Sequence, residues 1–187
     1  MEEGRLPIAR ARGAAVYPAR FMLIAATNPC PCGYAGEGDR CECSEAELAR
    51  HRRRLSGPLL DRIDLLVQLH RERDLRAEAT TSTRRAREQV KLARERQAAR
   101  LAGEGVAVNA AIDASMLRRH VVLDGRGEEL LRRAAASGML SARGQHRVLR
   151  VARTMADLHG SARVRAADLG AALALRPEVG LHGSRAA

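Results

Sequence analysis

The stretch FMLIAATNPCPCG, residues 21–33, carries the strongest fold signal in this sequence of 187 residues. Its first seven residues, Phe21–Thr27, form a continuous apolar run, which is typical of a strand buried on both faces of a sheet. Asn28 follows directly, and ligands of open α/β sheets bind beyond the carboxyl ends of the strands. The stretch therefore predicts an α/β domain with Asn28 at its ligand edge, although an Asn-Pro pair taken alone more often marks a turn.

The flanking segments extend this α/β prediction in both directions. Residues 5–20 are interpreted as two short extended pieces around a turn at Gly13. Ser44 with Glu47 three residues later forms a capping box, which predicts a short basic helix. The run DLLVQLH, residues 64–70, predicts a second buried strand. Together these segments indicate the end of an α/β domain.

All four cysteines lie within the loop that follows the first apolar run, as Cys30-x-Cys32 and Cys41-x-Cys43. Four thiolates satisfy one tetrahedral Zn²⁺, and clustered cysteines in a reduced cytosol bind metal more often than they form disulfides. The spacing is less usual than Cys-x-x-Cys, so unligated thiols and redox chemistry stay as alternatives. The pattern favours a structural zinc site.

The second half of the chain is helical by its periodicity and capping residues. The polar residues 71–83 are interpreted as a linker. Helices are then predicted over Thr83–Leu101, Asp113–Val121, 125–136, Ser141–His159 and Arg165–Leu175. Helices with such short connections form a small bundle. We therefore divide the chain into residues 1–72, the α/β portion, and residues 73–187, the helical domain.

Two sets of arginines are candidates for phosphate chemistry. Arg62 stands in GPLLDRID, residues 57–64, where an arginine at a protomer edge can reach a neighbour's nucleotide. A surface ion pair of Arg62 with Asp61 or Asp64 is the alternative. Arg143, Arg147 and Arg150 are three or four residues apart, so they are neighbours on one helix surface. Such a cluster indicates either a phosphate site or solvated charge.

The charge and composition exclude several classes of protein. The chain has 33 Lys and Arg against 22 Asp and Glu, a net charge of +11, which favours a polyanionic partner. Nearly all of these cations are arginine, so compositional bias is an equally good explanation. One Phe and two Tyr exclude extensive stacking on single-stranded bases. No apolar run is long enough to span a bilayer and the N-terminus lacks a signal sequence, so we expect a cytoplasmic protein without a membrane partner.

Four motifs together resemble one protein family. AATNPCPCG (25–33), CECS (41–44), SGPLLDRIDL (56–65) and SARGQHRVLRVARTMADL (141–158) closely resemble the magnesium-chelatase-like AAA+ ATPases of the ComM/YifB type. The resemblance implies an α/β-plus-α fold, in which the C-terminal part of an AAA+ P-loop core, with a hairpin and a Cys-rich loop, precedes an all-α helical lid bundle. Full-length relatives carry the P-loop and the acidic Mg²⁺ motif upstream, so we expect a C-terminal fragment.

The resemblance also implies roles for individual residues. Asn28 corresponds to sensor 1, which positions the attacking water. Arg62 corresponds to the arginine finger that acts on the next subunit. Arg143 corresponds best to the sensor 2 arginine of the lid, with Arg147 as the alternative. Arg10 and Arg12, in the hairpin of residues 5–20, are expected to contact DNA.

The expected function is that of an AAA+ ATPase working as a hexameric ring on DNA, with ATP and Mg²⁺, as in ComM-like branch migration during natural transformation. The sequence contains no GxxxxGK[ST] (Walker A) and no paired acidic Walker B motif, so this chain by itself should not hydrolyse ATP. One alternative is the motor subunit of magnesium chelatase, although the cysteines argue against it. Another is a non-enzymatic zinc- and DNA-binding module.

Overall fold

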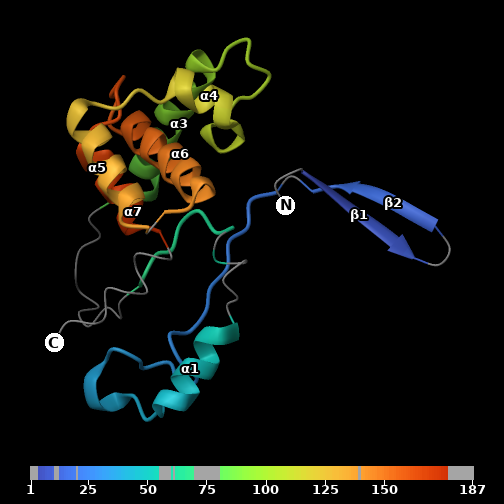
Figure 1. The fold of residues 1–187 in the computed structure, drawn as a ribbon, viewed down its shortest axis with the longest axis vertical. Coiled ribbons are helices and arrows are strands. Elements are labelled where there is room, and N and C mark those ends of the chain that lie inside the picture. The colour runs from blue at the N-terminus through green and yellow to red at the C-terminus, as the bar shows by residue number, and fades with distance from the viewer. Residues whose placement is uncertain are drawn as a thin grey trace. The chain divides into compact units, whose positions relative to one another are not determined.

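The computed structural model describes residues 4–10, 13–19, 21–54, 60, 62–69, 81–138 and 140–176. The chain divides into two compact units, residues 1–54 and residues 55–187. Figure 1 shows the elements of both units, coloured in chain order.

The first unit begins with a β-hairpin. Strands β1 (Arg5–Arg10) and β2 (Gly13–Pro18) pair antiparallel, in a register that runs from Arg5 opposite Pro18 to Arg10 opposite Gly13. Gly13 has a φ of 142°, a conformation that side chains other than hydrogen disfavour. The two extended pieces predicted from residues 5–20 are thus confirmed over the described part of that segment.

The two predicted buried strands are not formed. Residues 21–28 form no strand, and Met22 and Ile24 are more than 80% exposed. Residues 64–69 form no strand either, and Leu69 is 90% exposed, while His70 lies outside the described residues. A strand buried on both faces needs neighbouring strands and covering helices, whereas the β1–β2 pair is the only sheet among the described residues. The prediction was wrong for these segments because an apolar run shows only which environment the segment suits, and the described residues supply neither neighbouring strands nor a cover for it.

The Cys-rich loop leads into helix α1 (Glu45–Arg54) through a short 3₁₀ turn, η1 (Gly38–Arg40). The predicted capping box is present, because the Ser44 amide donates to Glu47 Oε2 (2.9 Å) and the Glu47 amide donates to Ser44 Oγ (3.3 Å). Acidic residues occupy the first turn of α1 and basic residues the last, which suits the helix dipole.

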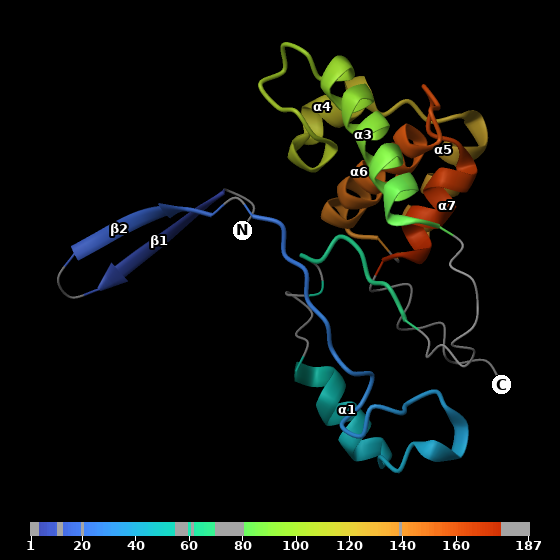
Figure 2. The same ribbon diagram turned by 180° about the vertical axis from the view of Figure 1, so that it is seen from behind.

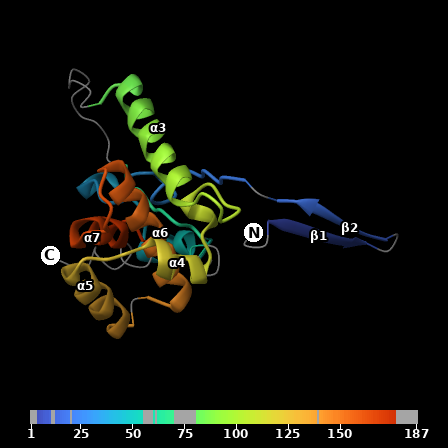
Figure 3. The same cartoon turned by 90° about the horizontal axis from the view of Figure 1, so that it is seen from above.

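The second unit contains the helices that the sequence predicted. They are α3 (Thr83–Arg100), α4 (Ala114–His120), α5 (Gly125–Ala136), α6 (Ala142–Leu158) and α7 (Ala166–Ala174), with a 3₁₀ turn η2 (Asn109–Ala111) before α4. Helix α6 is central and contacts α3, α4 and α7 (Figures 1 and 2). The N-terminal half of α3 extends beyond the other helices (Figure 3), and Val90 on it is 54% exposed.

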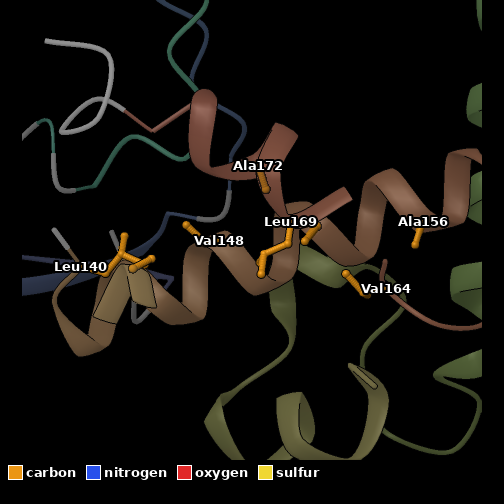
Figure 4. Packing of buried hydrophobic residues seen from close by; sticks show 8 residues of the cluster. Leu140, Val148, Ala156, Val164, Leu169 and Ala172 are labelled. Atoms are coloured by element: carbon orange, nitrogen blue, oxygen red, sulfur yellow. The ribbon is translucent and has the colours of Figure 1, made fainter. Parts of the chain in front are cut away.

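The core of this unit is aliphatic and built largely from small residues. Val148, Ala152 and Ala156 are buried along one face of α6 at four-residue intervals. They belong to the same buried cluster as Leu169 and Ala172 of α7, and Figure 4 shows Val148 near Leu169 and Ala156 near Val164. The alanines allow close approach of the two helices. None of the described helices is both long and apolar enough to cross a bilayer.

Candidate functional site

The four cysteines converge on one point. Their Sγ atoms all lie within 4.8 Å of one another, and all four thiols are free. The Sγ atom of Cys30 is 3.3 Å from that of Cys32 and 3.9 Å from that of Cys41, and Cys32 and Cys41 are 3.7 Å apart. In a tetrahedral site with Zn–S bonds of about 2.3 Å, neighbouring sulfurs are about 3.8 Å apart. The cluster therefore has the size of a single four-sulfur metal site.

The local backbone explains how two close pairs of cysteines meet. Gly33 (φ 84°) and Gly36 (φ 90°) adopt the left-handed conformation that reverses the loop between the pairs. The Gly33 amide donates to the carbonyl of Cys30 (3.1 Å), and the Ala35 amide donates to Cys30 Sγ (3.2 Å). The buried Cys30 sulfur thus receives a backbone hydrogen bond that favours its thiolate form.

The electrostatics of the cluster favour a cation. Burial raises the pKa of Cys30, but hydrogen bonds from Cys32 and the Ala35 amide outweigh it and lower the pKa to about 6. At Cys43 a backbone hydrogen bond lowers the pKa, yet burial and the neighbouring sulfurs outweigh it and raise the pKa to about 12. Ionisation of Cys30 therefore opposes ionisation of Cys43, whereas a metal ion stabilises the thiolates around it.

Asn28, the predicted sensor, lies two residues before the first cysteine and is exposed. Its main-chain carbonyl accepts a hydrogen bond from Nε2 of His51 on α1, at 2.8 Å. Because a carbonyl only accepts, the Nε2 atom of His51 carries the proton. The sequence analysis missed His51, since a single histidine on a basic helix has no distinctive spacing.

The second unit brings two other predicted residues together. Nη1 of Arg147 donates to the carbonyl oxygen of Arg62 (2.6 Å) and to Oδ1 of Asp64 (3.0 Å). The Arg147 side chain is only 8% exposed, whereas Arg62 and Arg143 are exposed. The sequence analysis considered Asp64 only as a partner for Arg62. No sequence pattern relates positions 64 and 147, so this pair is found only in the folded chain.

The remaining basic candidates have different surroundings. Arg10 is exposed at the end of β1, and Arg12 lies outside the described residues. On α3, Arg96 and Arg100 are directed inward, donating to the main-chain oxygen and the carboxylate of Asp157 respectively. Further along α3, Arg84 and Lys91 pair with glutamates one turn away. These four basic side chains of α3 therefore bond to groups within the same unit.

Comparison with known proteins shows which family models and which proteins this chain is similar to. Residues 1–77 match the family model of magnesium chelatase, subunit ChlI, and residues 80–176 match that of the ChlI C-terminal region. An uncharacterized protein of Mycobacterium tuberculosis is 44% identical over 181 residues, which cover 94% of this chain and 35% of that protein. Competence protein ComM of Haemophilus influenzae is 36% identical over 186 residues, which cover 97% of this chain and 35% of ComM. Protein YifB of Escherichia coli is 34% identical over 165 residues, which cover 86% of this chain and 32% of YifB.

The chain thus spans about a third of the length of the curated relatives it matches. The family matches cover the Cys-rich loop, the Arg62 segment and the helical unit alike. The chain therefore belongs to the magnesium chelatase family and has ComM and YifB among its relatives.

Proposed function

We propose that this chain forms the sensor, arginine-finger and lid region of an AAA+ ATPase that remodels or translocates DNA as a hexameric ring in the cytoplasm, as in ComM-like branch migration. The observation that carries the proposal is the pair of family matches over residues 1–77 and 80–176. Exposure of Arg62 and Arg143 supports it, since a side chain that contacts nucleotide must be accessible.

In this proposal each residue has a separate task. The Arg62 guanidinium stabilises negative charge on the phosphoryl group transferred in the neighbouring subunit. The Asn28 carboxamide orients the attacking water. Arg143 contacts the phosphates of its own subunit's nucleotide, and its exposure favours it for this task over Arg147, whose side chain is only 8% exposed. The 187 residues contain no Walker A or Walker B sequence, so they do not themselves provide ligands for Mg²⁺ or a cradle for ATP.

A chimaera tests the ATPase proposal. The segment of Haemophilus influenzae ComM that matches this chain is replaced by residues 1–187, and DNA-stimulated ATP hydrolysis is measured. We expect the chimaera to hydrolyse ATP and Arg62→Ala to abolish hydrolysis while nucleotide binding persists. The exposed α4 residue Arg118, changed to Ala, is the matched control and should leave the rate unchanged. Normal hydrolysis by Arg62→Ala, or Mg²⁺-dependent hydrolysis by the 187-residue chain alone, contradicts the proposal.

We further propose that Cys30, Cys32, Cys41 and Cys43 hold one structural Zn²⁺. Four sulfur ligands complete a tetrahedral shell and leave no position for a substrate, which is the pattern of structural rather than catalytic zinc. Two observations support this assignment: the four sulfurs lie within 4.8 Å of one another, and neighbouring sulfurs raise the pKa of Cys43. The role of the metal is to order the loop that follows Asn28.

Metal analysis of the chain purified without chelator tests the zinc proposal. We expect one zinc per chain, and loss of that zinc in Cys41→Ser. Glu42, which is exposed between two of the cysteines, provides the control, because Glu42→Gln changes a nearby charge and should keep the metal. Four titratable thiols with no bound metal would show that the cluster is not a zinc site.

A non-enzymatic zinc- and DNA-binding module is the second candidate, and the cysteine cluster is the observation that favours it. This module needs the metal loop and exposed basic residues but has no use for Arg62. Zinc-dependent DNA binding by the chain, together with unchanged ATP hydrolysis by the chimaera when Arg62 is changed to Ala, would establish this module in place of the ATPase.

A further inference from the structure

Arg147 connects helix α6 to a segment far away in the sequence. Its side chain is 8% exposed and lies on α6, yet its Nη1 atom reaches a main-chain oxygen 85 residues away, that of Arg62, and the carboxylate of Asp64. Burying a guanidinium is unfavourable unless it is paired and hydrogen-bonded. The contacts with Arg62 and Asp64 provide such pairing, and they hold the backbone on both sides of residue 63.

A second contact attaches the same segment further along. The amide of Leu66 donates to the carbonyl of Leu175, just after α7, at 2.8 Å. Residues 62–66 are therefore held to α6 by a charged pair and to the end of α7 by a backbone hydrogen bond. These contacts fix the main chain at Arg62 while its side chain stays exposed.

We propose that Arg147 and Asp64 are positioning residues that couple the lid helix α6 to the arginine finger Arg62. This inference rests on the proposed ATPase function. Arg143 precedes Arg147 by four residues, so both lie on the same side of α6. A helix moves as a rigid element, and a shift of α6 on nucleotide contact at Arg143 is passed through Arg147 to the backbone of Arg62. One subunit's nucleotide thereby sets the finger that acts on its neighbour.

The anchoring is tested first on the 187-residue chain. Asp64→Asn removes the carboxylate charge, and because Asp64 is 56% exposed the helical unit should still fold. Arg147→Lys keeps the charge but loses the forked geometry. We expect hydrogen exchange at the Leu66 amide to become about tenfold faster or more in both variants, with unchanged helical circular dichroism. Arg118→Lys is the control, and unchanged exchange in the two test variants would overturn the anchoring.

The coupling is tested in the ComM chimaera by separating kcat from KM. Because misplacing a catalytic group by about 1 Å can cost about a hundredfold in rate, we expect Asp64→Asn and Arg147→Lys to lower kcat by roughly tenfold or more. The KM for ATP should not change, and Asp64→Glu should retain most of the rate. A merely structural defect would not be restored by this conservative variant or confined to kcat.

The outcomes distinguish this inference from the function on which it rests. If Arg62→Ala leaves hydrolysis normal, the finger assignment itself fails, whatever the positioning variants do. If Arg62→Ala abolishes hydrolysis but Asp64→Asn and Arg147→Lys do not change kcat, the coupling is refuted and the ATPase proposal stands. If Arg147→Lys instead weakens nucleotide binding, Arg147 contacts the nucleotide directly and the positioning role is wrong.

Discussion

Replacing Asp157 by asparagine should destabilise the helical unit strongly. The Asp157 carboxylate is 1% exposed and lies where α6 meets α3. It accepts hydrogen bonds from Nη1 and Nη2 of Arg100 (2.6 and 2.8 Å), from Nη2 of Arg153 (3.0 Å) and from Nδ2 of Asn109 (2.8 Å). Two arginines thus share one buried negative charge.

The size of this loss of stability follows from the two arginines that the substitution leaves without a carboxylate partner. Arg153 is 1% exposed and Arg100 has a side chain 21% exposed, so water can relieve little of their mutual repulsion. Removing one partner of a buried ion pair costs about 3–5 kcal/mol, and the partial exposure of Arg100 places Asp157→Asn near the lower end. A domain of this size is stable by only about 5–15 kcal/mol. A loss of about 3 kcal/mol is therefore a large fraction of the total.

Urea unfolding followed by circular dichroism at 222 nm measures this loss. With a dependence of about 2 kcal/mol per molar urea, the midpoint should fall by about 1.5 M at unchanged slope. Glu88→Gln, which breaks the exposed pair with Arg84, is the matched acid-to-amide control and should have nearly the wild-type midpoint. A midpoint for Asp157→Asn within about 0.5 M of wild type would refute the reasoning that this buried charge holds α3 to α6.

Three further predictions concern single residues. Burial raises the pKa of Asp168, but hydrogen bonds from Arg165 and His159 outweigh it and lower the pKa below its usual value. The stability that Asp168 contributes is therefore fully present above its pKa in the unfolded chain, about 3.9, and is lost as pH falls through its pKa in the folded chain. Asp168→Asn should therefore make the unfolding temperature depend less on pH in the acid range. Asp113→Ala removes the hydrogen bonds to the first amides of α4 and should lower the unfolding temperature in calorimetry, whereas an unchanged temperature would mean that the cap is dispensable. If the chain contacts DNA through the hairpin, as the resemblance implies, Arg10→Ala should weaken binding of the chain to DNA and reduce the slope of its salt dependence by about one counterion. Fluorescence anisotropy measures both, and equal binding by the variant would contradict a DNA contact at Arg10.

Helix positions were predictable from the sequence because their signals are local. Asp113 and Ser141 cap α4 and α6 by accepting hydrogen bonds from amides two or three residues away. Such contacts need no partner from elsewhere in the chain. The apolar run at residues 21–27 failed as a predictor of a strand, since pairing is non-local and depends on which strands are present.

Local signals in the sequence were enough to predict the helical unit, the hairpin and the cluster of four cysteines, because caps, turns and closely spaced cysteines depend on residues near one another in the chain. The family was also identified from the sequence, and relatives at 34–44% identity agree with it. The partners of two arginines are visible only in the folded chain: the buried Arg147 pairs with Asp64 and the Arg62 carbonyl, and the partly buried Arg100 pairs with Asp157. The physical reason is that an arginine in the sequence is equally suited to solvent, phosphate or carboxylate, and the fold selects among them by burying the guanidinium beside one particular acceptor.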